Sequence, residues 1–355
     1  MKILHIYKCF NDPPKGGVEQ FIKQFSLVLK KNVKKNDIFV LGKINKSYSY
    51  ANLYSENELL NIASCGIGGV SFFIKFYKLM KSYDIFIFHY PWPFGDLLSF
   101  LLILSKKNYF IYYHSDIVRQ RFLKILYKPL EIFFLKNAKI IFTSSNNYLK
   151  SSLNLKKYSK KIKILPLFFS QDLNKKIKKR NLKSFSLQKK KYFVFVGSYR
   201  YYKGLEFLDK CVESFPDYKF IYIGSGIKKK ILLKKNTLIF ENVSDSKKYF
   251  LIKNSLGLIL PSIARSEAFG YSLLEALNLS VPMISTNLGT GTSFVNKNNH
   301  TGLVIKPKSI YELKKAINFF IHNKQMLKNF VKNSKKHYYK EFNFKKIVKI
   351  FIDSV

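Results

Sequence analysis

PSIARSEAFGYSLLEAL, residues 261–277, places two acidic residues in a mostly apolar stretch of a chain that is poor in them. Glu267 precedes an expected helix at 271–277, and Glu275 lies within that helix. A carboxylate accepts hydrogen bonds from vicinal hydroxyls of a ribose or hexose, and the amides of Phe269 and Gly270 near the helix start favour a phosphate. The alternative is one capping glutamate and one salt bridge at the core edge. The apolar surroundings favour the binding interpretation, because a buried carboxylate needs a partner.

This stretch lies in a series of alternating strands and helices. The pattern predicts strands at 192–196, 219–223, 256–260 and 282–285, and helices at 205–212, 271–277, 312–330 and 344–351. An earlier series predicts strands at 2–7, 38–41, 85–89, 109–114 and 139–143, with helices at 18–30 and 97–105. Residues 170–191 are polar and lysine-rich and have no apolar period, which is typical of a connection.

Alternating strands and helices favour parallel sheets covered on both faces, so the expected fold class is α/β. Two series of similar size predict two Rossmann-like domains that face each other across a cleft. Ligands in such sheets bind beyond the carboxyl ends of the strands. The expected boundaries are a first domain at 1–170, a linker at 171–191, a second domain at 192–340, and a closing helix at 341–355 that packs back on the first domain.

Three further places carry candidate chemistry. Gly16 and Gly17 stand between a strand and a helix, where backbone amides approach an anion, although this fragment alone favours a simple tight turn. His114, at the end of an apolar strand, is suited equally to donating to a sugar hydroxyl or phosphate and to bonding a neighbouring loop. Arg200 and Lys203 occupy the loop after strand 192–196 and suit a diphosphate; the alternative is a solvated pair of charges.

Composition bounds the class of protein. The chain has 355 residues, which predicts about two domains, and a formal net charge of +42, which favours polyanionic partners. Lys, Asn, Ile, Phe and Tyr all have A/T-rich codons, so genome composition accounts for part of this bias. The three cysteines are far apart, which predicts neither a disulfide framework nor a metal site. No signal peptide or membrane-spanning segment is expected.

Together these segments resemble family 4 of the retaining glycosyltransferases with the GT-B fold. The stretch from Glu267 to Glu275 resembles the E-x7-E signature of that family. The other matching segments are 16–19, 114–120, 201–204, 223–226 and 289–293, the last of a kind common in a mannosyltransferase-like branch. One departure concerns the residue after the glycine that matches Gly197. Many members carry arginine there and this chain has Ser198, so Arg200 is the candidate for that charge.

The resemblance implies roles for residues of the second domain. A UDP- or GDP-linked sugar binds mostly there, with Glu275 holding the ribose hydroxyls and the backbone of Val243 contacting the base. Arg200 and Lys203 neutralise the departing diphosphate, which stabilises developing charge. Glu267 and the amides of Phe269 and Gly270 position the donor sugar.

The resemblance also assigns residues of the first domain. His114 hydrogen-bonds the donor sugar, and Gly16 and Gly17 belong to the donor-binding set. Members of this kind need no bound metal and retain the anomeric configuration by front-face attack. The sequence agrees with metal independence, since it contains no Asp-x-Asp pair. The expected reaction is therefore transfer of a hexose, without a cofactor.

By the same analogy the acceptor is a growing glycan on a lipid-linked precursor of a surface polysaccharide such as O-antigen or capsule. Basic runs at 30–35, 156–163 and 228–230 are suited to an anionic membrane surface, at about 1 kcal/mol for each lysine, or are simply solvated. The expected location is cytoplasmic, with a peripheral contact on the inner face of the plasma membrane as an open alternative. A sugar-nucleotide epimerase or glycogen-synthase-like enzyme shares this shape. A nucleic-acid-binding protein fits the charge but lacks a motif, so no nucleic-acid partner is expected.

Overall fold

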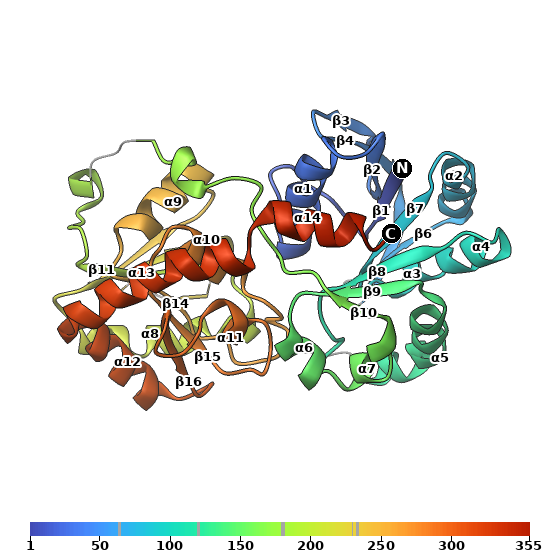
Figure 1. The fold of residues 1–355 in the computed structure, drawn as a ribbon. Coiled ribbons are helices and arrows are strands. Elements are labelled where there is room, and N and C mark those ends of the chain that lie inside the picture. The colour runs from blue at the N-terminus through green and yellow to red at the C-terminus, as the bar shows by residue number, and fades with distance from the viewer. Residues whose placement is uncertain (63–64, 119–120, 179–181, 229, 232–233) are drawn as a thin grey trace. The chain divides into compact units, whose positions relative to one another are not determined.

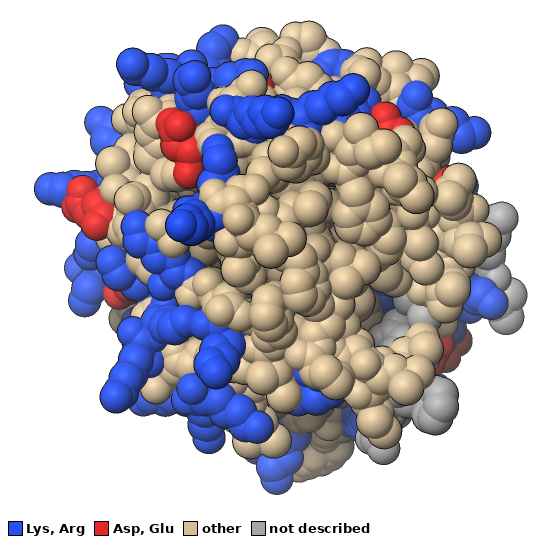
Figure 2. All heavy atoms as spheres, turned by 90° about the vertical axis from the view of Figure 1, so that its right-hand side faces the viewer, with Lys and Arg blue, Asp and Glu red and all other residues tan. Residues whose placement is uncertain are grey.

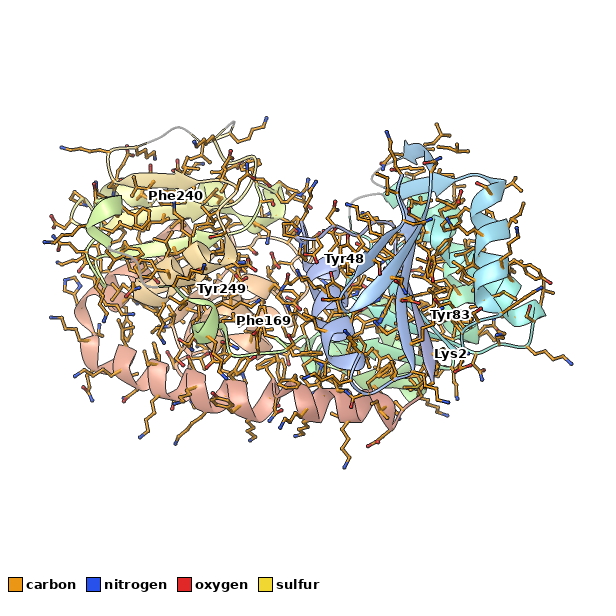
Figure 3. All side chains as sticks on the ribbon, turned by 90° about the horizontal axis from the view of Figure 1, so that it is seen from above. Lys2, Tyr48, Tyr83, Phe169, Phe240 and Tyr249 are labelled. Carbon is orange, nitrogen blue, oxygen red and sulfur yellow. The ribbon has the colours of Figure 1, made fainter. Side chains whose placement is uncertain are left out.

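The computed structural model describes residues 1–62, 65–118, 121–178, 182–228, 230–231 and 234–355. The chain forms two compact units (Figure 1). The first unit comprises Met1–Ser170 together with Phe344–Val355, and the second comprises Gln171–Asn343. Figure 3 shows how densely side chains fill both units, with Tyr48 and Tyr83 in the first and Phe240 and Tyr249 in the second.

The first unit is built on an eight-stranded sheet in the order β10-β9-β8-β7-β1-β2-β4-β3, in which only the β3–β4 pair is antiparallel. Its strands are β1 (Lys2–Ile6), β2 (Lys35–Leu41), β3 (Lys46–Tyr48), β4 (Ala51–Glu56), β7 (Ile85–Tyr90), β8 (Tyr109–Tyr113), β9 (Ile140–Thr143) and β10 (Ile162–Ile164). A separate hairpin joins β5 (Glu58–Ile62) to β6 (Cys65–Gly68). Every residue of β7 and β8 is buried, as expected for parallel strands covered on both faces.

The helices of this unit include one from the far end of the chain. They are α1 (Gly17–Leu29), α2 (Val70–Met80), α3 (Pro93–Asp96), α4 (Leu98–Leu104), α5 (Arg121–Asn137), α6 (Asn146–Ser151), α7 (Leu153–Lys156) and α14 (Phe344–Ile352). On α14, the buried Phe351 ring lies edge-on to Phe25 of α1, with centroids 4.8 Å apart, and 5.6 Å from Phe142 of β9. The C-terminal helix therefore completes the core of the first unit.

The second unit is built on a six-stranded, fully parallel sheet in the order β13-β12-β11-β14-β15-β16. Its strands are β11 (Tyr192–Val196), β12 (Lys219–Ile223), β13 (Thr237–Phe240), β14 (Gly257–Leu260), β15 (Met283–Thr286) and β16 (Gly302–Ile305). Its helices are α8 (Leu205–Asp209), α9 (Asp245–Asn254), α10 (Tyr271–Asn278), α11 (Thr292–Val295), α12 (Ile310–His322) and α13 (Lys324–Glu341). Short 3-10 turns lie at Ser159–Lys161, Leu173–Lys176, Leu182–Phe185, Tyr201–Lys203 and Val212–Ser214.

The described residues of the expected linker at 171–191 fall within the second compact unit. Leu173 is fully buried and donates its backbone N–H to Oδ1 of Asn278 over 2.9 Å. Leu187 is buried as well. Two isolated leucines produce no apolar period, so the lysine-rich composition concealed a segment that packs against its unit.

Two expected helices are also divided differently. The helix expected at 312–330 is two helices, because Asn323 between α12 and α13 has a non-helical backbone conformation (φ −105, ψ 62). The helix expected at 97–105 is preceded by the short α3, which begins at Pro93, a residue suited to a first helical turn. The sequence pattern also missed β13, α9 and β16, and α9 proves to carry a residue of the candidate site.

Candidate active site

The candidate site of the second unit is built where strands β11 and β14 end and α10 begins. Gly204, in the loop after β11, has a left-handed backbone (φ +67), and a Cβ there would lie 2.1 Å from the carbonyl oxygen of Pro261. Ile263 donates its N–H to the carbonyl of Tyr202 over 2.7 Å. The loop after β11 is thereby held against the segment that leads from β14 into α10.

This arrangement pairs Lys203 with Glu267. The ammonium of Lys203 lies 2.9 Å from Oε2 of Glu267, and both side chains are largely buried. The aliphatic part of Lys203 crosses Gly197, where a Cβ would lie 2.9 Å from Cδ of the lysine. Burial lowers the pKa of Lys203, but the carboxylates of Glu267 and, more weakly, Glu275 outweigh this and raise it overall. Lys203 is therefore a charged ammonium at neutral pH.

Glu275 has a partner that the sequence analysis did not identify. Oε1 of Glu275 lies 2.7 Å from the ammonium of Lys248 on α9, which also contacts Asp245 at 3.0 Å. Burial raises the pKa of the Glu275 carboxyl, and Lys248 opposes that rise. Burial lowers the pKa of Lys248, and Glu275 more than reverses it. Glu275 therefore forms a salt bridge, as the alternative interpretation expected. The ion pair with Lys248 still leaves lone pairs of the carboxylate that a ligand could use.

The start of α10 is fixed by its neighbours. Gly270 is the residue before the first helical turn and has a left-handed backbone (φ +83). Phe269 is buried, and its ring lies edge-on to Phe342 with centroids 6.0 Å apart. Gly291 donates its N–H to the carbonyl of Ala268 over 2.7 Å. The Thr290 hydroxyl donates to the carbonyl of Glu267 over 2.8 Å, so hydrogen bonds to the carbonyls of Glu267 and Ala268 hold the segment that carries both amides.

Arg200 and Val243 lie on loops of the same unit. Arg200 is exposed, and within the described ranges no ion pair to it is present. Val243 is partly buried in the loop between β13 and α9. Oε1 of Glu241 accepts the N–H of Ile227 over 2.9 Å, which ties this loop to the one after β12. Arg200 is thus the more accessible of the two cations assigned to a diphosphate.

Buried hydroxyls without a partner mark the same region. In the described part of the chain, the side-chain oxygens of Ser262, Ser272 and Tyr249 are buried and make no hydrogen bond. Ser262 follows β14, Ser272 lies in the first turn of α10, and Tyr249 follows Lys248 on α9. A buried polar atom without a partner is costly, and it is the kind of atom that a polar ligand satisfies. Sequence reasoning did not single out these residues, since isolated Ser and Tyr carry no pattern.

In the first unit, Gly16 and Gly17 lie at the N-terminus of α1 and are exposed. The backbone of Gly16 is extended (φ −143, ψ 166), a conformation open to any residue. The carboxylate of Glu19 accepts the N–H of Lys15 over 2.8 Å and the side-chain amide of Asn11 over 2.6 Å. The loop geometry therefore depends on Glu19 at least as much as on the paired glycines.

His114 follows β8 and lies at the end of a row of histidines. Its Nε2 is 2.9 Å from Nδ1 of His89, whose Nε2 is 3.0 Å from Nδ1 of His5. Nε2 of His5 is 3.1 Å from Oδ1 of Asn36. Burial lowers the pKa of His114 to about 3 and that of His5 to about 4. The alternative of a bonded histidine is thus partly realised, although the partner is another imidazole and not a loop.

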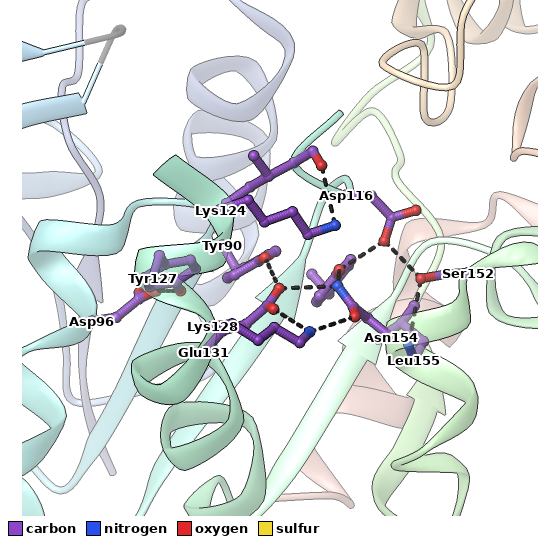
Figure 4. A network of polar contacts seen from close by, with 12 residues as sticks. Tyr90, Asp96, Asp116, Lys124, Tyr127, Lys128, Glu131, Ser152, Asn154 and Leu155 are labelled. Atoms are coloured by element: carbon purple, nitrogen blue, oxygen red, sulfur yellow. Dashed lines mark hydrogen bonds and ion pairs between the residues drawn. The ribbon is translucent and has the colours of Figure 1, made fainter. Parts of the chain in front are cut away.

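A network of polar side chains holds the segment that follows β8 (Figure 4). Oδ1 of Asp116 accepts the hydroxyls of Tyr113 over 2.8 Å and Ser152 over 2.7 Å, and the N–H of Asp116 donates to the Tyr148 hydroxyl over 2.6 Å. Glu131, fully buried on α5, contacts Lys128 at 2.6 Å. Asp116 therefore anchors the chain two residues beyond His114.

In the described residues, no three His, Cys, Asp or Glu side chains are placed to hold a metal ion. None of the described helices is long and apolar enough to cross a bilayer. The sequence-predicted residues divide between the units, with Gly16, Gly17 and His114 in the first. Those in the second are Arg200, Lys203, Val243, Glu267, Phe269, Gly270 and Glu275.

Comparison with known proteins defines the class. Residues 176–337 match the family model described as glycosyl transferases group 1. The chain is 31% identical to O-antigen chain mannosyltransferase C of Escherichia coli, over 99% of this chain and 97% of the relative. It is 32% identical to D-rhamnosyltransferase WbpZ of Pseudomonas aeruginosa, over 95% of this chain and 91% of the relative. The protein therefore belongs to the group 1 glycosyltransferases, and it is a glycosyltransferase enzyme.

The fold agrees with this membership. The structure of Anabaena HepE in complex with UDP-glucose superposes with a TM-score of 0.79 at 12% identity, covering 100% of this chain and 99% of that one. Two parallel α/β units of this kind constitute the GT-B fold, which confirms the fold class predicted from the sequence.

Proposed function

We propose that this enzyme transfers a hexose from a nucleotide-sugar to a lipid-linked glycan, as a step in the assembly of O-antigen or a related surface polysaccharide. The observation that carries the proposal is the pairing of Lys203 with Glu267 beside a second buried carboxylate, Glu275. The mannosyl- and rhamnosyltransferase relatives support the acceptor class, since the name of one refers to O-antigen chains.

The binding of the nucleotide follows from the charges of the second unit. Glu275, paired with Lys248, has lone pairs to accept both ribose hydroxyls. The backbone of Val243, held in the loop after β13, contacts the base. The complex of HepE with UDP-glucose supports a uridine nucleotide, and GDP is the alternative.

The chemistry depends on neutralising the leaving diphosphate. Arg200 and Lys203 supply cations, and the amides of Phe269 and Gly270 lie at the positive end of α10. Glu267 orients the sugar while its ion pair holds Lys203 near the phosphate. These groups perform the work that a divalent cation performs elsewhere, so the proposed reaction needs no metal.

We further propose that the reaction retains the anomeric configuration. Stabilising the departing group is then the main catalytic task, because the acceptor attacks from the face that the diphosphate leaves. His114 contributes a hydrogen bond to the substrate from the first unit, and the N-terminus of α1 at Gly16 and Gly17 contributes backbone amides. NMR of the product made from a defined α-linked donor tests the stereochemistry, and a β-linked product would contradict retention.

A panel of nucleotides tests the donor. Free UDP, GDP and their sugars are added to the full chain, and thermal unfolding is followed. A ligand at a hundred times its Kd adds about 2.7 kcal/mol to the free energy of unfolding, which is a readable shift. Transfer to a lipid-linked acceptor then separates a transferase from a sugar-nucleotide epimerase, which would isomerise the donor without an acceptor. The transferase relatives do not favour the epimerase.

The proposed location follows from the acceptor. An enzyme that acts on a lipid-linked glycan with a cytosolic nucleotide-sugar works at the inner face of the plasma membrane. The basic composition of the chain supports a contact with anionic headgroups.

A further inference from the structure

One side of the first unit exposes apolar side chains from three helices, α2, α4 and α5. The exposed apolar residues of this face are Val70, Ile74 and Tyr77 on α2, Phe100 and Leu104 on α4, and Leu123, Ile125, Leu126 and Ile132 on α5. Leu104, Ile125 and Leu126 are 80%, 70% and 68% exposed. The rings of Phe100 and Phe133 stack with centroids 4.4 Å apart, which joins α4 to α5, and α2 packs against α4. We call this surface the α2–α4–α5 face.

The exposed charged residues described on these three helices have one sign. The exposed lysines Lys78, Lys81, Lys106 and Lys136 lie on or directly after these helices. The only acidic residue within the three helices is Glu131, which is fully buried and paired with Lys128. Figure 2 looks onto this side of the unit and shows uncharged residues across its middle, with many Lys and Arg and few Asp and Glu at the margin. The face is therefore both apolar and cationic.

We propose that the α2–α4–α5 face inserts into the surface of an anionic lipid bilayer. Hydrocarbon accommodates the apolar side chains, and anionic headgroups neutralise the lysines at the margin. A second copy of the chain is the less favourable occupant, because lysines would meet lysines across such an interface. The inference deepens the proposed function, since a lipid-linked acceptor lies in the same bilayer. The lipid contact itself is argued only from the residues of the α2–α4–α5 face and does not depend on the identity of the acceptor.

The lipid contact differs from the purely electrostatic one that the basic runs suggest. Headgroup attraction is screened within about 3 Å at 1 M salt, whereas burial of apolar side chains persists. We therefore expect the full-length protein to cosediment with vesicles of phosphatidylcholine and phosphatidylglycerol at low salt and to remain bound at about 1 M salt. The double variant I125S/L126S should bind at least tenfold more weakly. The control Y311S replaces a 75% exposed aromatic residue of α12, in the second unit, and should bind as the wild type does.

Binding that disappears in high salt, or equal binding by I125S/L126S, would overturn the proposal. So would a wild-type dimer that the double variant converts to monomer, since the face would then be an interface between copies. The thermal shift of I125S/L126S with nucleotide-sugars is measured in parallel. Failure of the donor to bind would refute the proposed function and leave the vesicle result unaffected.

A second inference rests on the row of buried imidazoles. Asn36, His5, His89 and His114 come from β2, β1, β7 and the end of β8, which are consecutive strands of the sheet. The three contacts measure 3.1, 3.0 and 2.9 Å. His5 and His89 are fully buried, so no water competes for their nitrogens.

A neutral imidazole has one N–H donor and one acceptor nitrogen. Burial lowers the pKa of His5 to about 4, that of His114 to about 3, and that of His89 well below its usual value, so all three are neutral at pH 7. Along a row of neutral rings, every hydrogen bond must run in the same direction. Because Oδ1 of Asn36 can only accept, His5 donates from Nε2, His89 donates to His5, and His114 donates to His89.

We infer that His5 and His89 are positioning residues that hold His114 with Nε2 protonated and Nδ1 as a free acceptor. Nδ1 of His114 can then accept a hydrogen bond from a hydroxyl of the substrate. This last step rests on the proposed role of His114. The row also fixes the plane of the His114 ring. His114 is hydrogen-bonded to His89, and the His89 ring cannot turn without losing its hydrogen bond to His5.

Nitrogen-15 NMR of the histidine-labelled full chain tests the tautomer directly. We expect a pyridine-type Nδ1 and a protonated Nε2 for His114. In H89F, which keeps a ring but removes both nitrogens, we expect mixed tautomers and a kcat about tenfold lower, with unchanged affinity for the free nucleotide. The control H337F removes a buried histidine of α13 in the second unit and should leave the His114 signals unchanged.

A protonated Nδ1 on wild-type His114 would mean that the Asn36 amide is turned over and the row runs the other way, which overturns the inference. An unchanged His114 spectrum together with unchanged kcat in H89F would do the same. If the wild type did not bind a nucleotide, the proposed donor site would be refuted, but the result on the His114 tautomer would not be affected.

Discussion

The ammonium of Lys248 lies 2.7 Å from Oε1 of Glu275, and both side chains are largely buried. The residue expected to hold a ribose is therefore also one half of an ion pair that joins α9 to α10. Removing one partner of such a pair leaves the other charge without compensation, which costs about 3–5 kcal/mol. The Glu275 carboxylate thus contributes both to the stability of the second unit and, by the proposal, to donor binding. A single substitution at Glu275 changes both quantities at once and cannot separate them.

A double-variant comparison separates the two roles of Glu275. We expect E275A to lose both stability of the second unit and affinity for the nucleotide-sugar, the latter about ten- to a hundredfold because a charge-assisted hydrogen bond contributes about 1.5–3 kcal/mol. E275A/K248M removes the orphaned ammonium and should regain much of the stability. Chemical unfolding and titration with the donor measure the two quantities. If the double variant also regained donor affinity, Glu275 would be a structural residue only.

Lys203 offers a test of leaving-group stabilisation. K203M removes an ammonium that contacts Glu267 at 2.9 Å, and we expect kcat to fall by about a hundred- to a thousandfold, as for loss of one preorganised group that stabilises developing charge. Affinity for the free nucleotide should fall less, because the charge develops as the bond breaks. Steady-state kinetics and nucleotide titration supply the comparison, with the exposed Lys228 changed to Met as the control. A loss of nucleotide affinity with unchanged kcat would contradict this role and would indicate that Lys203 acts only in ground-state binding.

Much of this site was predictable because its acidic residues are scarce. Glu267 and Glu275 stand out in an apolar stretch, and the strand and helix that flank them follow the expected periods, so the α/β fold class was confirmed. Lys248 was not predictable, because a lysine among 63 Lys and Arg residues carries no signal. Its helix was missed as well, since most of its residues are polar.

The row of histidines was unpredictable for a different reason. His5 and His89 are single histidines in apolar strands, where sequence favours a core position. Only the order of the strands, β8-β7-β1-β2, places them in line with His114. That order is set by long-range pairing and leaves no trace in the local pattern. The C-terminal helix was expected to pack on the first domain, and its Phe351 ring lies against Phe25 of α1 in the first unit.

Gly204 is expected to tolerate no side chain. Its left-handed backbone disfavours alanine, and a Cβ would lie 2.1 Å from the backbone oxygen of Pro261. G204A should therefore lower the free energy of unfolding by roughly 1–3 kcal/mol and displace Lys203, with a loss of kcat. The matched control is G226A, since Gly226 is also left-handed (φ +76) but its nearest contact is the Tyr199 Cβ at 3.7 Å. Similar losses of kcat in G204A and G226A would show that the close approach to the Pro261 oxygen is not what lowers the activity of G204A.

Activity is expected to survive removal of divalent cations. The cations of the candidate site are Arg200 and Lys203, and the proposed mechanism assigns the diphosphate to them. Turnover in excess EDTA should equal turnover without it. The control adds Mg²⁺ or Mn²⁺ to the chelated enzyme. Loss of turnover with EDTA and its return with either metal would show that the two side chains do not replace a metal ion.

Acid should destabilise the first unit through its buried histidines. The pKa of His5 is lowered from 6.5 to about 4 by burial, which outweighs the opposing effects of Asn36 and Asp37. Between these values the unfolded chain binds a proton that the folded chain does not, so the free energy of unfolding decreases as the pH falls from about 6.5 towards 4. For His5 alone the full effect is about 3 kcal/mol. Trp92, the single tryptophan and buried in the first unit, reports the unfolding by its fluorescence.

The measurement is urea unfolding in steps between pH 7.5 and about 5, before most carboxylates titrate. H5F should flatten the dependence of the free energy on pH, because a phenyl ring takes up no proton in either state. The control is H322F, which removes an exposed histidine of α12 in the second unit. The same slope in H5F and in the wild type would show that the imidazole row does not govern the acid response, and that His5 is charged or solvated in the folded protein.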